Sequence, residues 1–158
     1  MANNRGKQFE LKFAQDFKAT VPNCSLDRIY DSVSGFKSVS NVCDFIGYSK
    51  PNIFYIECKS HQGNTFPIKN LTQYDKLSKK VNIPGVRAGV IIWFIDHPEC
   101  VVYVPISTFT KLIQDGKKSF HVNMVGKDDY PNLKIPSTLK RVFNDSNYSC
   151  LLDLPEGW

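Results

Sequence analysis

Three charged residues interrupt two apolar segments of the chain, and their types and spacing could support hydrolysis. Residues 43–60 read CDFIGYSKPNIFYIECKS, in which Asp44, Glu57 and Lys59 stand among strand-forming residues. An unpaired carboxylate or ammonium is costly to bury, so these charges need a local reason. Glu57 and Lys59 are two positions apart, which places both on the same face of a strand.

The Lys-Pro-Asn sequence at 50–52 predicts a turn that joins the two apolar segments into a hairpin. Such a hairpin lays Asp44 alongside Glu57 and Lys59. Two carboxylates that converge on one point repel each other, and this favours a divalent cation between them. A small number of hard oxygen ligands suits Mg²⁺ or Mn²⁺, both of which keep bound water.

An amine beside such a metal site extends the possible chemistry. Lys59 could polarise a water molecule or stabilise a negative charge that develops during reaction. The pattern is therefore that of metal-assisted phosphodiester hydrolysis. The alternative is an exposed ion pair between Glu57 and Lys59 on a surface strand, which would contribute under about 1 kcal/mol to stability.

Hydrophobic periodicity predicts an α/β fold with a central mixed sheet flanked by helices. Phe9, Phe13 and Phe17 recur every four residues and predict a helix over 3–20. Further helices are expected over 68–82 and 106–119, the second of them ending near Gly116. Apolar runs predict strands over 26–31, 43–49, 52–60, 84–96 and 100–106, and the less regular tail suggests one more within 146–158.

Length and composition narrow the class of protein. A chain of 158 residues with 42% hydrophobic residues predicts a single domain over 1–158, whose core needs no disulfide or structural metal. Its five cysteines form no C-x-x-C pair, which favours reduced thiols in a cytoplasmic protein. We expect no membrane segment and no signal peptide. The net charge of +5 permits a polyanionic partner such as DNA without requiring one.

Two sets of motifs carry a resemblance to a known family. Asp44, followed after twelve residues by Glu57-Cys58-Lys59, resembles the signature of the PD-(D/E)XK nucleases, with Cys43 in place of the proline. The stretches NRGKQFE, SNVCDFIGY, FYIECKSHQGNTFPIKNL and QYDKL, in this order, resemble the RecU-type Holliday junction resolvases of Gram-positive bacteria and their phages. This likeness covers roughly residues 3 to 95.

The resemblance implies a restriction-endonuclease-like core and a role for each matching residue. Asp44, Glu57 and the backbone carbonyl of Cys58 would bind the metal, and Lys59 would be the catalytic lysine. Glu10 would complete the site through metal or water. The remaining implied contacts are Gln73 with water, metal or the scissile phosphate, and Arg5 with a phosphate.

Further DNA contacts are expected from positive charges. Helix-end lysines would track the phosphates, unless they only solvate the surface: Lys69, Lys76, Lys79 and Lys80. A short stalk-like insertion is expected at about 23–41, with Arg28 and Lys37 as its charges.

The sequence thus predicts a Mg²⁺-dependent endodeoxyribonuclease that resolves four-way DNA junctions during recombination. Symmetric cleavage of such a junction needs two active sites, so a homodimer is expected. The expected compartment is the cytoplasm of a bacterial cell or of a phage-infected host. The alternatives are a related nuclease that acts on another DNA structure, a non-catalytic DNA-binding module of the same fold, and a structural or partner-binding protein with an accidental resemblance.

Overall fold

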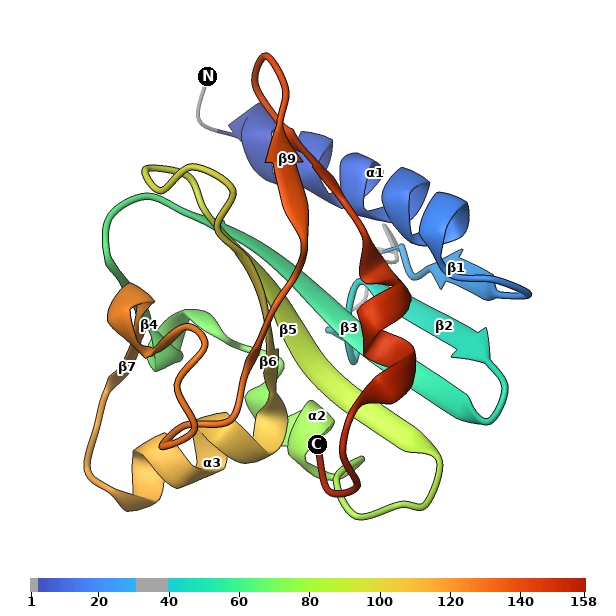
Figure 1. The fold of residues 1–158 in the computed structure, drawn as a ribbon. Coiled ribbons are helices and arrows are strands. Elements are labelled where there is room, and N and C mark those ends of the chain that lie inside the picture. The colour runs from blue at the N-terminus through green and yellow to red at the C-terminus, as the bar shows by residue number, and fades with distance from the viewer. Residues whose placement is uncertain (1–2, 31–39) are drawn as a thin grey trace, which may run out of the picture.

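A six-stranded mixed sheet organises the part of the chain that the computed structural model describes, residues 3–30 and 40–158 (Figure 1). Only β3 and β5 are parallel, and the other neighbouring strands are antiparallel. The strands follow the order β1 (Ser25–Arg28), β2 (Phe45–Ser49), β3 (Asn52–His61), β5 (Val86–Phe94), β6 (Val101–Pro105) and β8 (Leu133–Lys134). Helices flank this sheet, which confirms the predicted α/β architecture.

Of the remaining elements, only the first and third helices are longer than six residues in the described part of the chain. The helices are α1 (Asn3–Thr20), α2 (Tyr74–Ser78) and α3 (Ile106–Gln114). Two small ribbons pair β4 (Thr65–Pro67) with β7 (Ser119–His121), and β9 (Ser137–Leu139) with β10 (Asn144–Ser146). The 3₁₀ turns are η1 (Ile68–Asn70), η2 (Val122–Met124) and η3 (Tyr148–Asp153).

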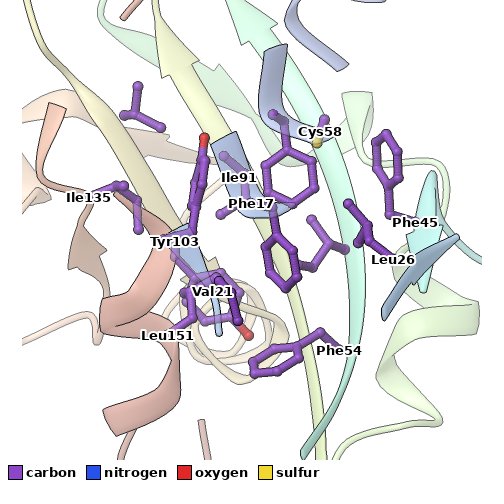
Figure 2. Packing of buried hydrophobic residues seen from close by; sticks show 14 of the residues in the cluster. Phe17, Val21, Leu26, Phe45, Phe54, Cys58, Ile91, Tyr103, Ile135 and Leu151 are labelled. Carbon is purple, nitrogen blue, oxygen red and sulfur yellow. The ribbon is translucent and has the colours of Figure 1, made fainter. Parts of the chain in front are cut away.

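The phenylalanine stripe of α1 covers one face of the sheet. Phe13 packs on Phe45 with ring centroids 5.2 Å apart, and Phe17 packs on Phe54 at 6.1 Å. The rings labelled in Figure 2 form part of this core, together with Leu26. The four-residue spacing places all three phenylalanines of α1 on its buried side, as predicted.

Helices α2 and α3 cover the opposite face over β5 and β6. Leu77 of α2 and Phe109 of α3 are fully buried there with Val90 and Val102. Strand β5 is buried on both faces from residue 88 to residue 94, as its continuous apolar run predicts.

Two predicted elements differ from the structure. The helix expected over 68–82 is wrong in extent, because the chain forms only η1 and the five-residue α2 there. Leu71 between them leaves the helical region with ψ of 77° and is buried against the α2 and α3 side of the core. The strand expected within 146–158 is wrong, since this segment contains η3. Tyr148, Leu151 and Leu154 recur every three residues, which is the 3₁₀ period, and all three are buried.

Gly89 in β5 permits the close packing of Tyr103 from β6. A Cβ atom built on Gly89 would collide with two ring carbons and the hydroxyl oxygen of Tyr103, whose side chain is fully buried. We expect Gly89→Ala to lower the free energy of unfolding by about 1–3 kcal/mol through overpacking. Urea denaturation followed by tryptophan fluorescence measures the change.

Gly6→Ala in α1 is the matched control for this substitution. A Cβ atom there would meet only Ser60 Oγ, at 4.0 Å, and alanine favours the helix by up to about 1 kcal/mol. Equal unfolding midpoints for Gly89→Ala and the wild type would contradict the packing described for Tyr103.

Candidate active site

The pairing of β2 with β3 places Asp44 beside Glu57. Phe45 pairs with Ile56 in this register, so one step further along each strand sets Asp44 opposite Glu57. Asp44 Oδ2 accepts the backbone N–H of Cys58 at 2.8 Å, and the carbonyl of Asp44 accepts the N–H of Ile29 at 2.8 Å. Asp44 is therefore held from both neighbouring strands although it lies one residue before β2.

Glu57 and Lys59 project from β3 to the face that α2 and α3 occupy further along the sheet. Lys59 Nζ lies 2.8 Å from Glu57 Oε1. The Glu57 side chain is only 2% exposed, whereas that of Lys59 is 25% exposed. Cys58 points to the opposite face and is buried in the α1 core, as the alternation of the strand predicts.

A third carboxylate reaches this cluster from α1. Glu10 forms an ion pair with the Arg28 guanidinium of β1, and Gly6, one helical turn earlier, approaches Ser60 of β3. Burial raises the pKa of the Glu10 carboxyl, and the charge of Asp44 adds to this rise while Arg28 opposes it. These influences show that Glu10 and Asp44 are close enough to repel each other.

Burial and neighbouring charge strongly perturb Glu57. Its pKa rises from 4.5 to about 7, first because the side chain is buried and then because Asp44 is near. Lys59 opposes this rise, and Glu10 contributes to it. Among the described residues, three carboxylates thus share the cluster with two cations, Lys59 and Arg28.

The donor set fits a hard divalent cation. Glu57 Oε2 is buried without a hydrogen-bond partner, so one carboxylate oxygen is available in a position that otherwise costs free energy. The N–H and C=O of one strand residue point to the same side, so the Cys58 carbonyl faces the Asp44 side, where its N–H bonds. Within residues 3–30 and 40–158, no group of three or more His, Cys, Asp or Glu side chains is placed to hold a metal. Two carboxylates with a carbonyl suit Mg²⁺, which keeps several waters.

The other residues predicted for the site lie at varying distances from it. Gln73 immediately precedes α2, and its side-chain oxygen accepts a hydrogen bond from Thr72. Its predicted catalytic contact stays a prediction, as do the metal and catalytic roles of Asp44, Glu57, Lys59 and Glu10. Arg5 is exposed on the first turns of α1, beside Trp93 and Ile95 at the end of β5.

The predicted DNA-binding lysines occupy the α2 region. Lys69 and Lys79 are exposed, and the Lys80 ammonium lies 4.9 Å from the centre of the Tyr55 ring. Lys76 donates to the carbonyl and hydroxyl of Ser40, on the approach to Asp44. Lys37 lies outside the described residues.

The sequence did not reveal the position of Arg28. The residue was expected to contact DNA from a stalk-like insertion at about 23–41, and this contact stays a prediction. Residues 31–39 of that segment lie outside the described part of the chain, and residues 25–28 form the edge strand β1 of the central sheet. There Arg28 pairs with Glu10 and lies over the ring of Tyr30, 5.3 Å from its centre. The register of β1 on β2 puts Arg28 opposite Phe45, and no short turn in the sequence signals this pairing.

Comparison with known proteins gives similarity in fold among solved structures. No family model and no curated protein matches the chain. Among solved structures, the chain is similar to Hjc of Archaeoglobus fulgidus, a Holliday junction resolvase from an archaeal hyperthermophile. The TM-score is 0.49 with 16% sequence identity, over 65% of this chain and 78% of that chain. A likeness at this level carries no argument about activity, which has to rest on the chemistry of the site.

None of the helices in the described part of the chain combines the length and the apolar character needed to cross a membrane.

The raised pKa of Glu57 predicts a pH-dependent stability. Between pH 4.5 and about 7, Glu57 keeps a proton in the folded state that it has lost in the unfolded chain. The charged carboxylate therefore lowers the free energy of unfolding by its full amount above pH 7, and this loss disappears below pH 4.5. In EDTA, Glu57→Gln should therefore raise the free energy of unfolding at pH 8, by on the order of 2–3 kcal/mol, and by much less at pH 5. Urea denaturation at both pH values measures this difference.

Glu156→Gln, at an exposed carboxylate near the C-terminus, is the control and should change stability little at either pH. A Glu57→Gln variant that loses the same stability at pH 8 and pH 5 would show that Glu57 serves as an ordinary ion-pair partner of Lys59.

Proposed function

We propose that the chain is a divalent-metal-dependent endonuclease that cleaves DNA, with four-way junctions as its substrate. The observation that carries this proposal is Glu57, which is 2% exposed, repelled by Asp44 and left with an unpartnered oxygen. Such an arrangement lowers the stability of the fold, and strongly perturbed groups of this kind cluster at functional sites.

Each residue of the cluster has a proposed role. Asp44, Glu57 and the Cys58 carbonyl would hold Mg²⁺, or Mn²⁺ in its place. The bound cation would supply charge neutralisation at the phosphate and a more acidic water. Lys59, whose ammonium lies against Glu57, would donate a hydrogen bond to the attacking water or to a phosphate oxygen as its charge grows.

Glu10 and Arg28 would act at the border of the site. The positively charged guanidinium of Arg28 lies against the Glu10 carboxylate and thereby weakens the repulsion between Glu10 and Asp44. In this role Arg28 orients Glu10, and its proposed contact with DNA would be made from the edge of the sheet.

The choice of a four-way junction rests on the resemblance to RecU-type resolvases and on the requirements of the reaction. Resolution needs paired cuts in two strands, and a two-fold homodimer supplies two equivalent sites. The net charge of +5 and the lysines near α2 suit phosphate contacts, which give salt-dependent binding with little sequence preference. The proposed compartment is the cytoplasm of a bacterium or of a phage-infected cell, where recombining DNA is present.

A related nuclease with a different DNA substrate would have the same site, so substrate shape has to separate the two. Labelled four-way junction, fork, flap and linear duplex, each with Mg²⁺ or with EDTA, provide this test. Preferential cleavage of the junction in Mg²⁺ supports resolution, and preferential cleavage of a fork or flap would replace it. Without metal-dependent cleavage of any of the four, the nuclease proposal fails.

Asp44→Asn should abolish cleavage while junction binding in EDTA is kept. The amide can still accept the Cys58 N–H through its oxygen, but it lacks the charge that a divalent cation needs. Gel cleavage and fluorescence anisotropy measure the two properties. Asp128→Asn, at an exposed loop carboxylate, is the control and should cleave like the wild type. Metal-dependent cleavage by Asp44→Asn at the wild-type rate would remove Asp44 from the site.

Lys59→Ala should slow the single-turnover rate by roughly 100- to 1,000-fold, because a donor to the developing charge is lost. Junction affinity should change by less than about threefold, since one phosphate contact at most disappears. Lys127→Ala, at an exposed lysine of the 126–130 loop, is the matched control. A variant whose entire defect disappears at saturating protein would contradict a role of Lys59 in the chemical step.

A further inference from the structure

The hairpin of β2 and β3 has one buried face and one open face. Phe45, Phe54 and Ile56 are buried beneath α1. On the opposite face, Tyr48 and Ile53 pair in register and are 46% and 38% exposed. Helices α2 and α3 pack on β5 and β6, so they leave this end of the hairpin open.

The open face leads directly to the carboxylate cluster. Alternate residues of β3 point to this side, so Ile53 and Tyr55 are followed on the same face by Glu57 and Lys59. Tyr48 is four residues from Asp44 along the adjacent chain, a separation of about 13 Å at strand spacing. A DNA strand with its phosphate at the cluster would therefore extend across the Tyr48 ring.

Charge is distributed unequally around this face. On the side next to α2, the Lys80 ammonium lies over the Tyr55 ring, and Lys76 is anchored to Ser40. Lys50 is exposed at the turn of the hairpin. On the other side, β1 contributes an exposed carboxylate, Asp27, which pairs in register with Ile46. Phosphates are favoured on the lysine side and disfavoured beside Asp27.

We propose that this open face binds unpaired nucleotides of the DNA substrate, with the Tyr48 ring as the surface on which a base stacks. The inference rests on the proposed function and adds to it that a nucleotide beside the scissile phosphate leaves its base pair when the junction is bound. The face of a base becomes accessible only when the base leaves the duplex, and open sheet faces with aromatic residues and nearby cations are suited to such bases. The phosphates follow Lys76 and Lys80, and the base edges point towards Asp27, which can accept a hydrogen bond from an exocyclic amino group.

The same features disfavour a second copy of the chain as the occupant. Charged residues are depleted from the core of a protein–protein interface, especially in homodimers. Here the apolar side chains of β2 and β3 lie between the Asp27 carboxylate and the Lys80 ammonium. This charge pattern matches a nucleotide, which has an anionic backbone on one side and amino groups on the other.

The test uses the full chain in EDTA with a single-stranded oligonucleotide that contains 2-aminopurine, whose fluorescence is quenched by stacking. Tyr48→Ser should weaken single-strand binding by roughly 5- to 100-fold and abolish the quench that the protein causes. Tyr48→Phe keeps the ring and should bind like the wild type. Linear duplex affinity should be the same for all three proteins, because duplex bases are not available to Tyr48.

Tyr130→Ser is the matched control. Tyr130 also lies beside lysines, 5.2 Å from Lys111 and 5.8 Å from Lys117, but it packs against α3. It should bind single strands like the wild type. Unfolding midpoints for all the variants show whether a loss of binding reflects a loss of folding.

Several outcomes would overturn the proposal in different ways. Single-strand binding and quenching by Tyr48→Ser at wild-type levels, in a protein that still cleaves junctions, would remove the stacking surface and leave the nuclease in place. Loss of dimer in sedimentation of Tyr48→Ser, with unchanged single-strand binding, would assign the face to a second copy of the chain. A wild-type protein that neither binds nor cleaves any DNA would instead remove the proposed function itself.

Discussion

The register between β2 and β3 is the constraint on which the site depends. It sets Asp44 next to Glu57, and the hydrogen bond from Cys58 N–H to Asp44 Oδ2 continues the pairing one residue beyond β2. A slip of one residue would turn Glu57 and Lys59 into the α1 core and bring Cys58 to the cluster. The site therefore requires that the alternation along β3 be held firmly, and the aromatic contacts of α1 with Phe45 and Phe54 hold it.

Stability and chemistry oppose each other at this point of the sheet. Burial of Glu57 near Asp44 favours the protonated form of Glu57, whereas binding a cation needs the charged form. The packing of α1 across the sheet offsets this cost, because its three phenylalanines are almost completely buried. A divalent cation would relieve the same repulsion, so metal binding and folding are linked through one carboxylate. Arg28 provides a smaller, permanent compensation at Glu10.

Local patterns in the sequence predicted most of the fold and the centre of the site. The spacing of Phe9, Phe13 and Phe17 predicted α1 with its observed bounds, and the short turn at 50–52 predicted that Asp44 would meet Glu57. The contact of Arg28 with Glu10 was missed because it depends on the docking of an edge strand, which no short turn specifies. The form of η3 was missed for a similar reason, since Tyr148 and Leu151 are placed by packing against the α1 core.

The alternation that buries Glu57 also exposes Tyr48. Both residues are on the face of the hairpin that α1 does not cover, one at the end near the carboxylates and the other near the turn. Leu71 interrupts the helix that the sequence suggests at 68–82, so η1 and the five-residue α2 stand in its place. One face of the hairpin thus holds both a nearly buried carboxylate and an exposed aromatic ring, because the same alternation along β2 and β3 directs both side chains to it.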